Sequence, residues 1–168
     1  DYGAGSGVLG LAACSLASSS PPTESPIRAI GVEIDLDAVN IANENAAANN
    51  LPMYNYLPRP SDDDDPETAS LLMKALNRAQ INAESKNKDN SEVKFAQALP
   101  VELNGPVYDA CAANILAGPL IGLRKTIASM VKPGGKIGLS GILADQANNV
   151  VDAYREYFDD VKVDGEEE

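Results

Sequence analysis

The sequence predicts an α/β fold, a Rossmann-like and doubly wound domain with a mostly parallel sheet. Three observations support this fold class. The chain opens on a glycine-rich turn over residues 1–7, which leads directly into an apolar helix. The apolar segment 27–35 then carries acidic residues at its end, which is typical of a buried parallel strand. A helical pattern over 36–49 follows, and this alternation predicts a parallel sheet with right-handed crossovers.

Length and composition indicate one domain over residues 1–168. Hydrophobic residues make up 44% of the chain, which is enough for a core, and no apolar run is long enough to cross a membrane. The chain starts on the glycine turn without a strand before it, and it stops soon after a strand-like segment at 161–163. We therefore expect a domain that is truncated at both ends.

The charge of the chain bears on its partners. The formal net charge is −12, and acidic runs lie at 62–65 and 166–168. Because proteins neutralise nucleic-acid phosphates with Lys and Arg, this balance argues against direct binding of nucleic acid. It is compatible with a basic protein partner.

Two residue types limit the chemistry. The chain has no histidine, which removes the commonest general base and the commonest metal ligand. Cys14 and Cys111 lie in apolar stretches and are expected to be buried free thiols. We therefore expect no metal site and a reducing cytoplasmic or organellar compartment. Separately, we expect a monomer.

The first elements follow from local signals. A helix is predicted over 8–16, before a Pro- and Ser-rich loop that ends at Pro26. Asp35 or Asp37 is expected to cap the helix over 36–49, and the pair Asn49-Asn50 marks its end. The segment 51–57 has the pattern of a short strand.

Residues 58–92 have the pattern of an insertion. They contain the acidic run and a predicted helix over 67–86. A further strand is possible at 93–96, so the third strand of the sheet lies on one flank of the insertion or the other.

The remaining elements return to the alternating pattern. A strand is predicted over 107–114, and a helix with Pro119 in its first turn continues to about Met130. The segment 132–135 is expected to be a turn, and Gly141 a break. The other predicted elements are a strand over 136–140, a helix over 144–158 and a last strand over 161–163.

Three strand ends carry the candidate site. In an open parallel sheet, ligands bind outside the carboxyl ends of the strands. The glycine turn, Glu33 and Asn114 each lie at such an end, so we expect them to converge on one crevice. The turn places Gly3, Gly5 and Gly7 after Asp1, a spacing that lets backbone approach a ligand closely.

The polar side chains of these ends suit different parts of a ligand. A carboxylate such as Glu33 can accept both hydroxyls of a ribose, although a solvated acid at a strand end is the plainer interpretation. Asp35 has two interpretations, a helix cap and a cofactor contact. Asn114 offers an amide carbonyl that can accept a hydrogen bond from an amine, or it caps the next helix.

The turn resembles the first motif of Rossmann-like methyltransferases that use S-adenosylmethionine. More specifically, nearly the whole chain outside 58–92 is similar to the catalytic domain of the ribosomal protein L11 methyltransferase (PrmA) family. The segments that carry this resemblance are DYGAGSG at 1–7, GVEID at 31–35, the asparagines within 45–50, ANILAGPL at 113–120, KPGG at 132–135 and LSGIL at 139–143.

The resemblance implies methyl transfer from S-adenosyl-L-methionine to lysine amino groups of a basic ribosomal protein. It implies cofactor binding by Asp1, the three glycines Gly3, Gly5 and Gly7, and the polar residues Glu33, Asp35 and Asn114. Asn114 would also be the catalytic residue on the acceptor side. Glu33 stands where the family usually has Asp, and the acidic insertion is a further departure.

Three alternatives stay open. One is a methyltransferase of the same fold that acts on a small molecule, another protein or a nucleic-acid base, although Asn114-Ile115-Leu116 lacks the aromatic residue of base methyltransferases. Another is a non-catalytic module that binds the cofactor. A nicotinamide-dependent reductase is disfavoured by Val8, which stands in the place of a third spaced glycine.

Overall fold

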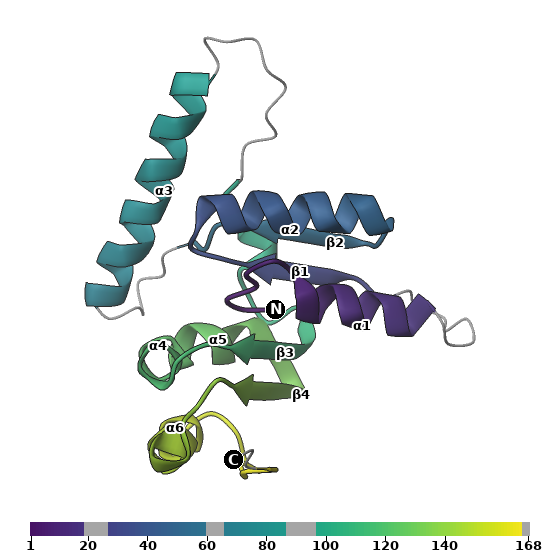
Figure 1. Ribbon diagram of the computed structural model, residues 1–168. Coiled ribbons are helices and arrows are strands. Elements are labelled where there is room, and N and C mark those ends of the chain that lie inside the picture. Colours follow the sequence, from purple (N-terminus) through teal and green to yellow (C-terminus); the bar gives the residue numbers. More distant parts are fainter. Residues whose placement is uncertain (19–26, 60–65, 87–96, 166–168) are drawn as a thin grey trace.

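The computed structural model describes residues 1–18, 27–59, 66–86 and 97–165, and it confirms the α/β fold class (Figure 1). Within these ranges the strands are β1 (Ala29–Val32), β2 (Met53–Tyr56), β3 (Tyr108–Asn114) and β4 (Val131–Ser140). The helices are α1 (Val8–Ser18), α2 (Leu36–Asn49), α3 (Pro66–Lys86), α4 (Ala117–Gly122), α5 (Arg124–Met130) and α6 (Ala147–Tyr154), with short 3-10 helices at Val101–Leu103 and Ala144–Gln146.

Tyr2 joins two pairs of parallel strands into one sheet. β1 pairs with β2, and β3 pairs with β4, both in parallel. Tyr2 forms parallel bridges to Val32 of β1 and to Ala113 of β3, so it lies between the two pairs. The order across the sheet is therefore β2, β1, Tyr2, β3, β4. The chain steps outward in opposite directions from Tyr2, which makes this position a topological switch point of the kind where open α/β sheets bind ligands.

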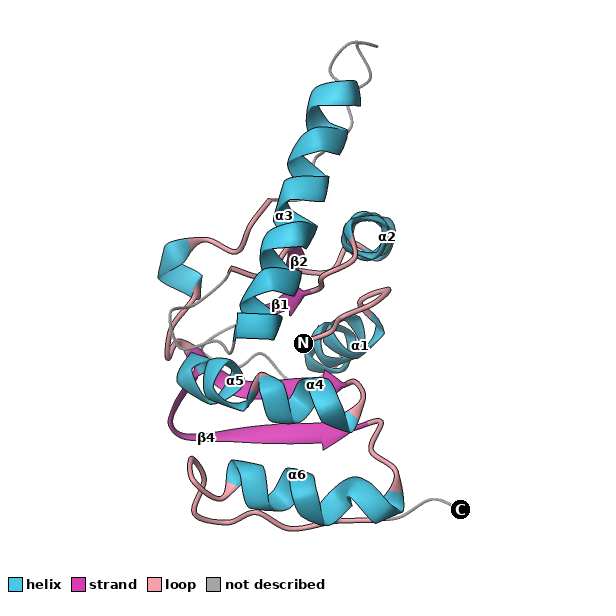
Figure 2. Cartoon of the chain, turned by 90° about the vertical axis from the view of Figure 1, so that its left-hand side faces the viewer, coloured by secondary structure: helices cyan, strands magenta, loops and turns pink. Residues whose placement is uncertain are grey.

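The strand order determines which face of the sheet each group of helices covers. α1 and α2 pack on β1 and β2, while α5 packs on β4 and α6 packs on α4. Figures 1 and 2 show α1 and α2 together beside one half of the sheet, and α4, α5 and α6 beside the other half. Because the two halves are built outward in opposite directions, right-handed crossovers place these two groups of helices on opposite faces, which is a doubly wound arrangement.

The main core lies under β3, β4 and the helices beside them. Its buried members are Tyr2, Val32, Leu99, Ala113, Ala117, Leu120, Leu123, Ile127, Met130, Val150 and Tyr154. Tyr154 is fully buried, and its hydroxyl donates a hydrogen bond of 3.0 Å to the Leu120 carbonyl. Since a buried hydroxyl without a partner is costly, this bond lets α6 bring a tyrosine into the core against α4.

The predicted elements of the first half are confirmed with small shifts of their ends. α2 has the predicted bounds, with Asp35 as its N-cap and Asn50 in the left-handed conformation at its end (φ 53°). β2 pairs with β1 and is therefore the third strand of the sheet, on the N-terminal flank of the insertion. The alternative strand at 93–96 lies outside the described residues.

α3 confirms the helix predicted within the insertion. Figure 1 shows it rising away from the sheet, with most of its length apart from the other elements. Leu72 is buried, and Leu76 packs against the small cluster formed by Val39 and Leu57. The helix is therefore anchored to α2 and to the end of β2 by a few apolar side chains.

The helix predicted up to Met130 is two helices. α4 ends at Gly122 and α5 begins at Arg124, with Leu123 between them (φ −91°, ψ 4°). Gly122 has a low helix propensity, which weakens a continuous helix at this point. The Arg124 guanidinium donates a hydrogen bond of 2.8 Å to the Ile121 carbonyl, which stabilises the break.

Three other predictions in this half need correction. β4 already begins at Val131, because the expected turn at 132–135 is a bulge within the strand, with Gly134 at φ 78°. The helix expected over 144–158 is regular only over α6 and is preceded by a 3-10 turn. The strand expected at 161–163 is wrong, since this segment is irregular in the structure and Val161 packs against the core. The predicted break at Gly141 is confirmed (φ 78°).

Candidate functional site

The glycine turn is held against the end of β1 by its backbone. Gly3, Gly5 and Gly7 all have positive φ angles, of 74°, 54° and 84°. The N–H groups of Gly3 and Ala4 both donate to the Val32 carbonyl, at 2.8 and 3.1 Å. A side chain on Gly3 would collide with Ile115, the residue after Asn114. The turn is therefore in contact with both neighbouring strand ends.

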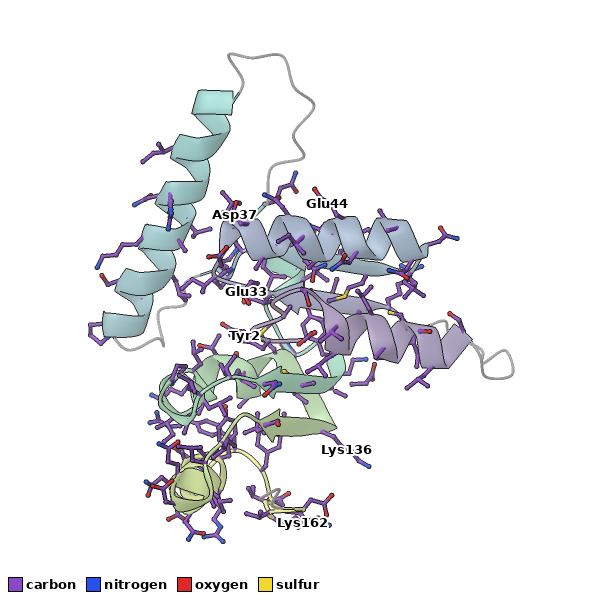
Figure 3. All side chains as sticks on the ribbon, viewed as in Figure 1. Tyr2, Glu33, Asp37, Glu44, Lys136 and Lys162 are labelled. Carbon is purple, nitrogen blue, oxygen red and sulfur yellow. The ribbon has the colours of Figure 1, made fainter. Side chains whose placement is uncertain are left out.

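Glu33 reaches the turn directly. Its Oε2 atom accepts a hydrogen bond of 2.9 Å from the Gly5 N–H, and its Oε1 atom accepts one of 3.0 Å from the Asp35 N–H. Figure 3 shows Glu33 and Tyr2 close together at the centre of the molecule, whereas Lys136 and Lys162 lie at the side away from α3. Two predicted site elements, 28 residues apart in sequence, thus make a direct contact.

Asp1 and Asp35 are directed at the starts of helices. Asp1 Oδ2 accepts a hydrogen bond of 3.0 Å from the Gly10 N–H in the first turn of α1. Its other oxygen, Oδ1, is buried and has no hydrogen-bond partner among the described residues. Asp35 Oδ1 accepts from the N–H groups of Asp37 and Ala38, at 2.8 and 3.1 Å, so the interpretation as a helix cap is confirmed.

Asn114 lies at the end of β3, opposite Ser140 of β4 in the sheet register. Its side chain is exposed, and the residue that caps α4 is Leu116, so the alternative interpretation as a helix cap is wrong. The turn after β4 comes very close to it. A methyl group on Gly141 would lie 2.8 Å from Asn114 Oδ1 and 3.0 Å from the Ile115 carbonyl oxygen. Gly141 thus packs directly against the predicted acceptor-side amide.

The three strand ends lie side by side, as the sequence predicts. Tyr2 pairs with Val32 and Ala113, which are the residues just before Glu33 and Asn114. Two strand spacings, or about 10 Å, therefore separate the backbones at these two positions. An edge of this width brings a carboxylate, a glycine turn and an amide within the span of one small ligand. The cofactor roles of Asp1, Gly3, Gly5, Gly7, Glu33, Asp35 and Asn114 stay predictions.

Sequence reasoning missed one side chain that contacts the turn from a helix. Asn45 of α2 donates a hydrogen bond of 3.0 Å from Nδ2 to the Ser6 carbonyl. Asn45 belongs to a segment that carries the family resemblance, but its position in a helix gave it no chemical role. Its spacing from Ala42 and Ala46 was the available signal, because these buried residues show which face of α2 is turned inward.

The cysteines are free, and the described residues form neither a metal site nor a membrane-spanning helix. Cys14 is buried, Cys111 is half-buried, and both are free, while burial raises the pKa of each thiol. No cluster of three acidic, cysteine or histidine side chains among the described residues offers a metal site. In the same ranges, no helix combines the length and the apolar character needed to cross a bilayer.

Comparisons with known proteins agree with this geometry. The family model of ribosomal protein L11 methyltransferase (PrmA) matches residues 1–72 and 71–168. A ribosomal protein L11 methyltransferase from Pseudomonas fluorescens (strain SBW25) is 33% identical over 159 residues, and one from Cellvibrio japonicus (strain Ueda107) is 35% identical over 163 residues. Each match covers 95% of this chain, which spans 38% of the length of these relatives.

A solved structure has the same fold. The crystal structure of a ribosomal protein L11 methylase from Lactobacillus delbrueckii subsp. bulgaricus matches 94% of this chain and 57% of its own, with a TM-score of 0.53 and 22% identity. The arrangement of strands and helices is thus that of a class I methyltransferase. The family model, the relatives and the glycine turn beside Glu33 lead to one conclusion: the chain belongs to the ribosomal protein L11 methyltransferase (PrmA) family.

Proposed function

We propose that this chain is the catalytic part of a methyltransferase that transfers a methyl group from S-adenosyl-L-methionine to lysine amino groups of ribosomal protein L11. The hydrogen bond between Glu33 and Gly5 is the observation that carries this proposal. It joins the acid suited to a ribose to the turn suited to the methionine half of the cofactor. Family membership indicates the reaction class.

The residues present fit this cofactor. Each Glu33 oxygen accepts one backbone N–H, and since a carboxylate has about four acceptor positions, capacity remains for two ribose hydroxyls. A methyl group on Gly5 would meet nothing within 4 Å, so the turn is open at this point. In this proposal Gly3, Gly5 and Gly7 form the floor under the cofactor, while Asp1 and Asp35 fix the starts of α1 and α2 around it.

The protein contributes positioning more than chemistry. Bound S-adenosylmethionine supplies a methyl group that its sulfonium already activates. Asn114 is the proposed catalytic residue, because its amide oxygen can accept a hydrogen bond from the attacking amine and orient it. A lysine amine, with an ordinary pKa of about 10.4, must first lose a proton, and a less solvated crevice lowers that pKa. Because the chain has no histidine, the proton passes to solvent in this proposal.

The net charge of −12 favours a basic protein as substrate over a nucleic acid. We further propose that the protein acts as a monomer and does not contact nucleic acid directly.

Transfer of a labelled methyl group tests the proposal. Full-length protein is incubated with labelled S-adenosylmethionine and either purified ribosomal protein L11 or a ribosomal extract. The proposal predicts label on L11 and on no other component of the extract. Label on RNA would instead identify a base methyltransferase, and cofactor binding without any transfer would identify a non-catalytic module.

A further inference from the structure

Three hydrogen bonds run in series through the glycine turn. The Gly5 N–H donates to Glu33 Oε2 at 2.9 Å, and the Gly7 N–H donates to the Ala4 carbonyl at 2.8 Å. The Ser6 carbonyl in turn accepts a hydrogen bond of 3.0 Å from Asn45 Nδ2. Ala4 C=O and Gly5 N–H belong to one peptide unit, and Ser6 C=O and Gly7 N–H belong to another. The chain of bonds therefore passes from Glu33 through two peptide units to Asn45.

The direction of these bonds makes them mutually supportive. Each peptide unit donates toward Glu33 and accepts from the side of Asn45, so the dipoles are aligned with the negative carboxylate at one end. Aligned hydrogen bonds polarise one another, and loss of one weakens its neighbours. A rotation of either peptide unit would break two bonds at once. Asn45 and Glu33 thus hold the turn from its two ends.

The peptide unit between these two, Gly5–Ser6, is unpaired within the described part of the chain. Among the described residues, no hydrogen bond holds its carbonyl or its N–H. It is flanked on both sides by peptide units whose orientation is fixed. Asn45 itself is half-buried and lies on the face of α2 that touches the turn, because a methyl group on Gly7 would lie 3.2 Å from Ala42.

We propose that Asn45 is a positioning residue for the cofactor turn and that it acts together with Glu33 through this chain of hydrogen bonds. Asn45 orients the Ser6–Gly7 peptide, which leaves the Gly5–Ser6 peptide directed at the cofactor. The inference rests on the proposed function, since its readout is the affinity for S-adenosylmethionine.

Matched alanine variants on one helix test it. Asn45→Ala and Asn49→Ala remove the same side chain one turn apart. Among the described residues, the Asn49 side chain donates only to the Asn45 backbone carbonyl. Isothermal titration of the full-length protein with S-adenosylmethionine is carried out well below each melting temperature. Asn45→Ala is expected to raise Kd on the order of tenfold, and Asn49→Ala to leave it unchanged.

Two further variants separate positioning from packing. Asn45→Asp keeps the shape of the side chain but has no N–H donor, so it is expected to bind no better than Asn45→Ala. In a Glu33→Ala background, Asn45→Ala is expected to cost less affinity than in the wild type, since the chain is already broken. Additive losses, or an Asn45→Asp variant with wild-type affinity, would overturn the proposed role.

The outcomes for the two proposals differ. If the wild type binds and Glu33→Ala weakens binding, but Asn45→Ala binds like Asn49→Ala, only the inference about Asn45 fails. If the wild type does not bind S-adenosylmethionine, the proposed function fails and the inference fails with it.

Discussion

Glu33, at the end of β1, accepts a hydrogen bond of 2.9 Å from the backbone N–H of Gly5. This contact places a carboxylate beside a turn whose three glycines have positive φ angles, at the switch point of the sheet. The same oxygen atoms are the ones proposed to accept the ribose hydroxyls. In the proposed function the contact has two roles, because it shapes the turn before binding and presents the acid to the cofactor.

Glu33→Ala is expected to weaken binding of S-adenosylmethionine. It removes the acceptor for the ribose and releases the Gly5 N–H, and hydrogen bonds to charged groups contribute about 1.5–3 kcal/mol, or roughly 10- to 100-fold in Kd. Isothermal titration measures the change. Asp37→Ala, which removes an exposed acid from the first turn of α2, is the control and should bind normally. Equal affinity of Glu33→Ala and the wild type would remove the ribose assignment.

Asn114→Ala is expected to slow turnover with little loss of cofactor affinity. The amide is proposed to orient the attacking amine, and poor orientation of a reacting group costs on the order of 100-fold in rate. Single-turnover methyl transfer to L11 gives the rate, and titration gives the affinity. Asn148→Ala, an exposed residue of α6, serves as the matched variant. A loss of affinity as large as the loss of rate would contradict an acceptor-side role.

Gly3→Ala and Gly5→Ala are expected to fail in different ways. Both place a side chain at positive φ, at a cost of about 1–2 kcal/mol. The methyl group on Gly3 also collides with Ile115, whereas that on Gly5 enters open space. Thermal unfolding should therefore show the larger loss of stability for Gly3→Ala. Gly5→Ala should lose more cofactor affinity than its small loss of stability accounts for. If Gly5→Ala instead binds the cofactor better than Gly3→Ala does, the open side of the turn is not the binding side.

Alkaline pH is expected to destabilise the fold through buried tyrosines. Burial raises the pKa of Tyr108 to about 12, and it also raises the pKa of Tyr154. Below about pH 10 both phenols are neutral in the folded and unfolded states, so they add no pH dependence. Above that pH the unfolded chain ionises first, and the free energy of unfolding should fall up to about pH 12 for Tyr108.

Denaturant unfolding at several alkaline pH values measures this fall. Tyr108→Phe removes one ionisable group, together with a hydrogen bond of 2.9 Å to the Leu103 carbonyl. The variant should therefore be less stable at neutral pH and lose less stability between about pH 10 and pH 12. An identical slope in the wild type and the variant would show that Tyr108 ionises as freely as in the unfolded chain.

Short-range signals account for the parts of the fold that the sequence predicted well. The cap at Asp35 and the left-handed Asn50 act within a few residues, and they fixed both ends of α2 correctly. The acid at the end of the apolar segment located Glu33, because parallel strands present their carboxyl ends at one edge. The strand predicted over 161–163 is wrong, since a Val-Lys-Val segment forms a strand only where a partner strand is available to it.

Contacts between distant segments set the limit of sequence-based prediction at the site. Asn45 and Ser6 are 39 residues apart, and no local pattern links an asparagine in a helix to a carbonyl in a turn. Gly3 and Ile115, or Gly141 and Asn114, likewise meet only once the sheet order is known. The division into α4 and α5 depended on the balance between a weak helix former, Gly122, and the packing of two short helices.

A crystal structure of the full-length protein with S-adenosylhomocysteine, the demethylated product, tests the central claim most directly. The account predicts both ribose hydroxyls within hydrogen-bond distance of the Glu33 carboxylate, the amino-acid end over Gly5–Ser6, and the sulfur facing Asn114. A nucleoside bound away from these strand ends, or one that Glu33 does not touch, would contradict it.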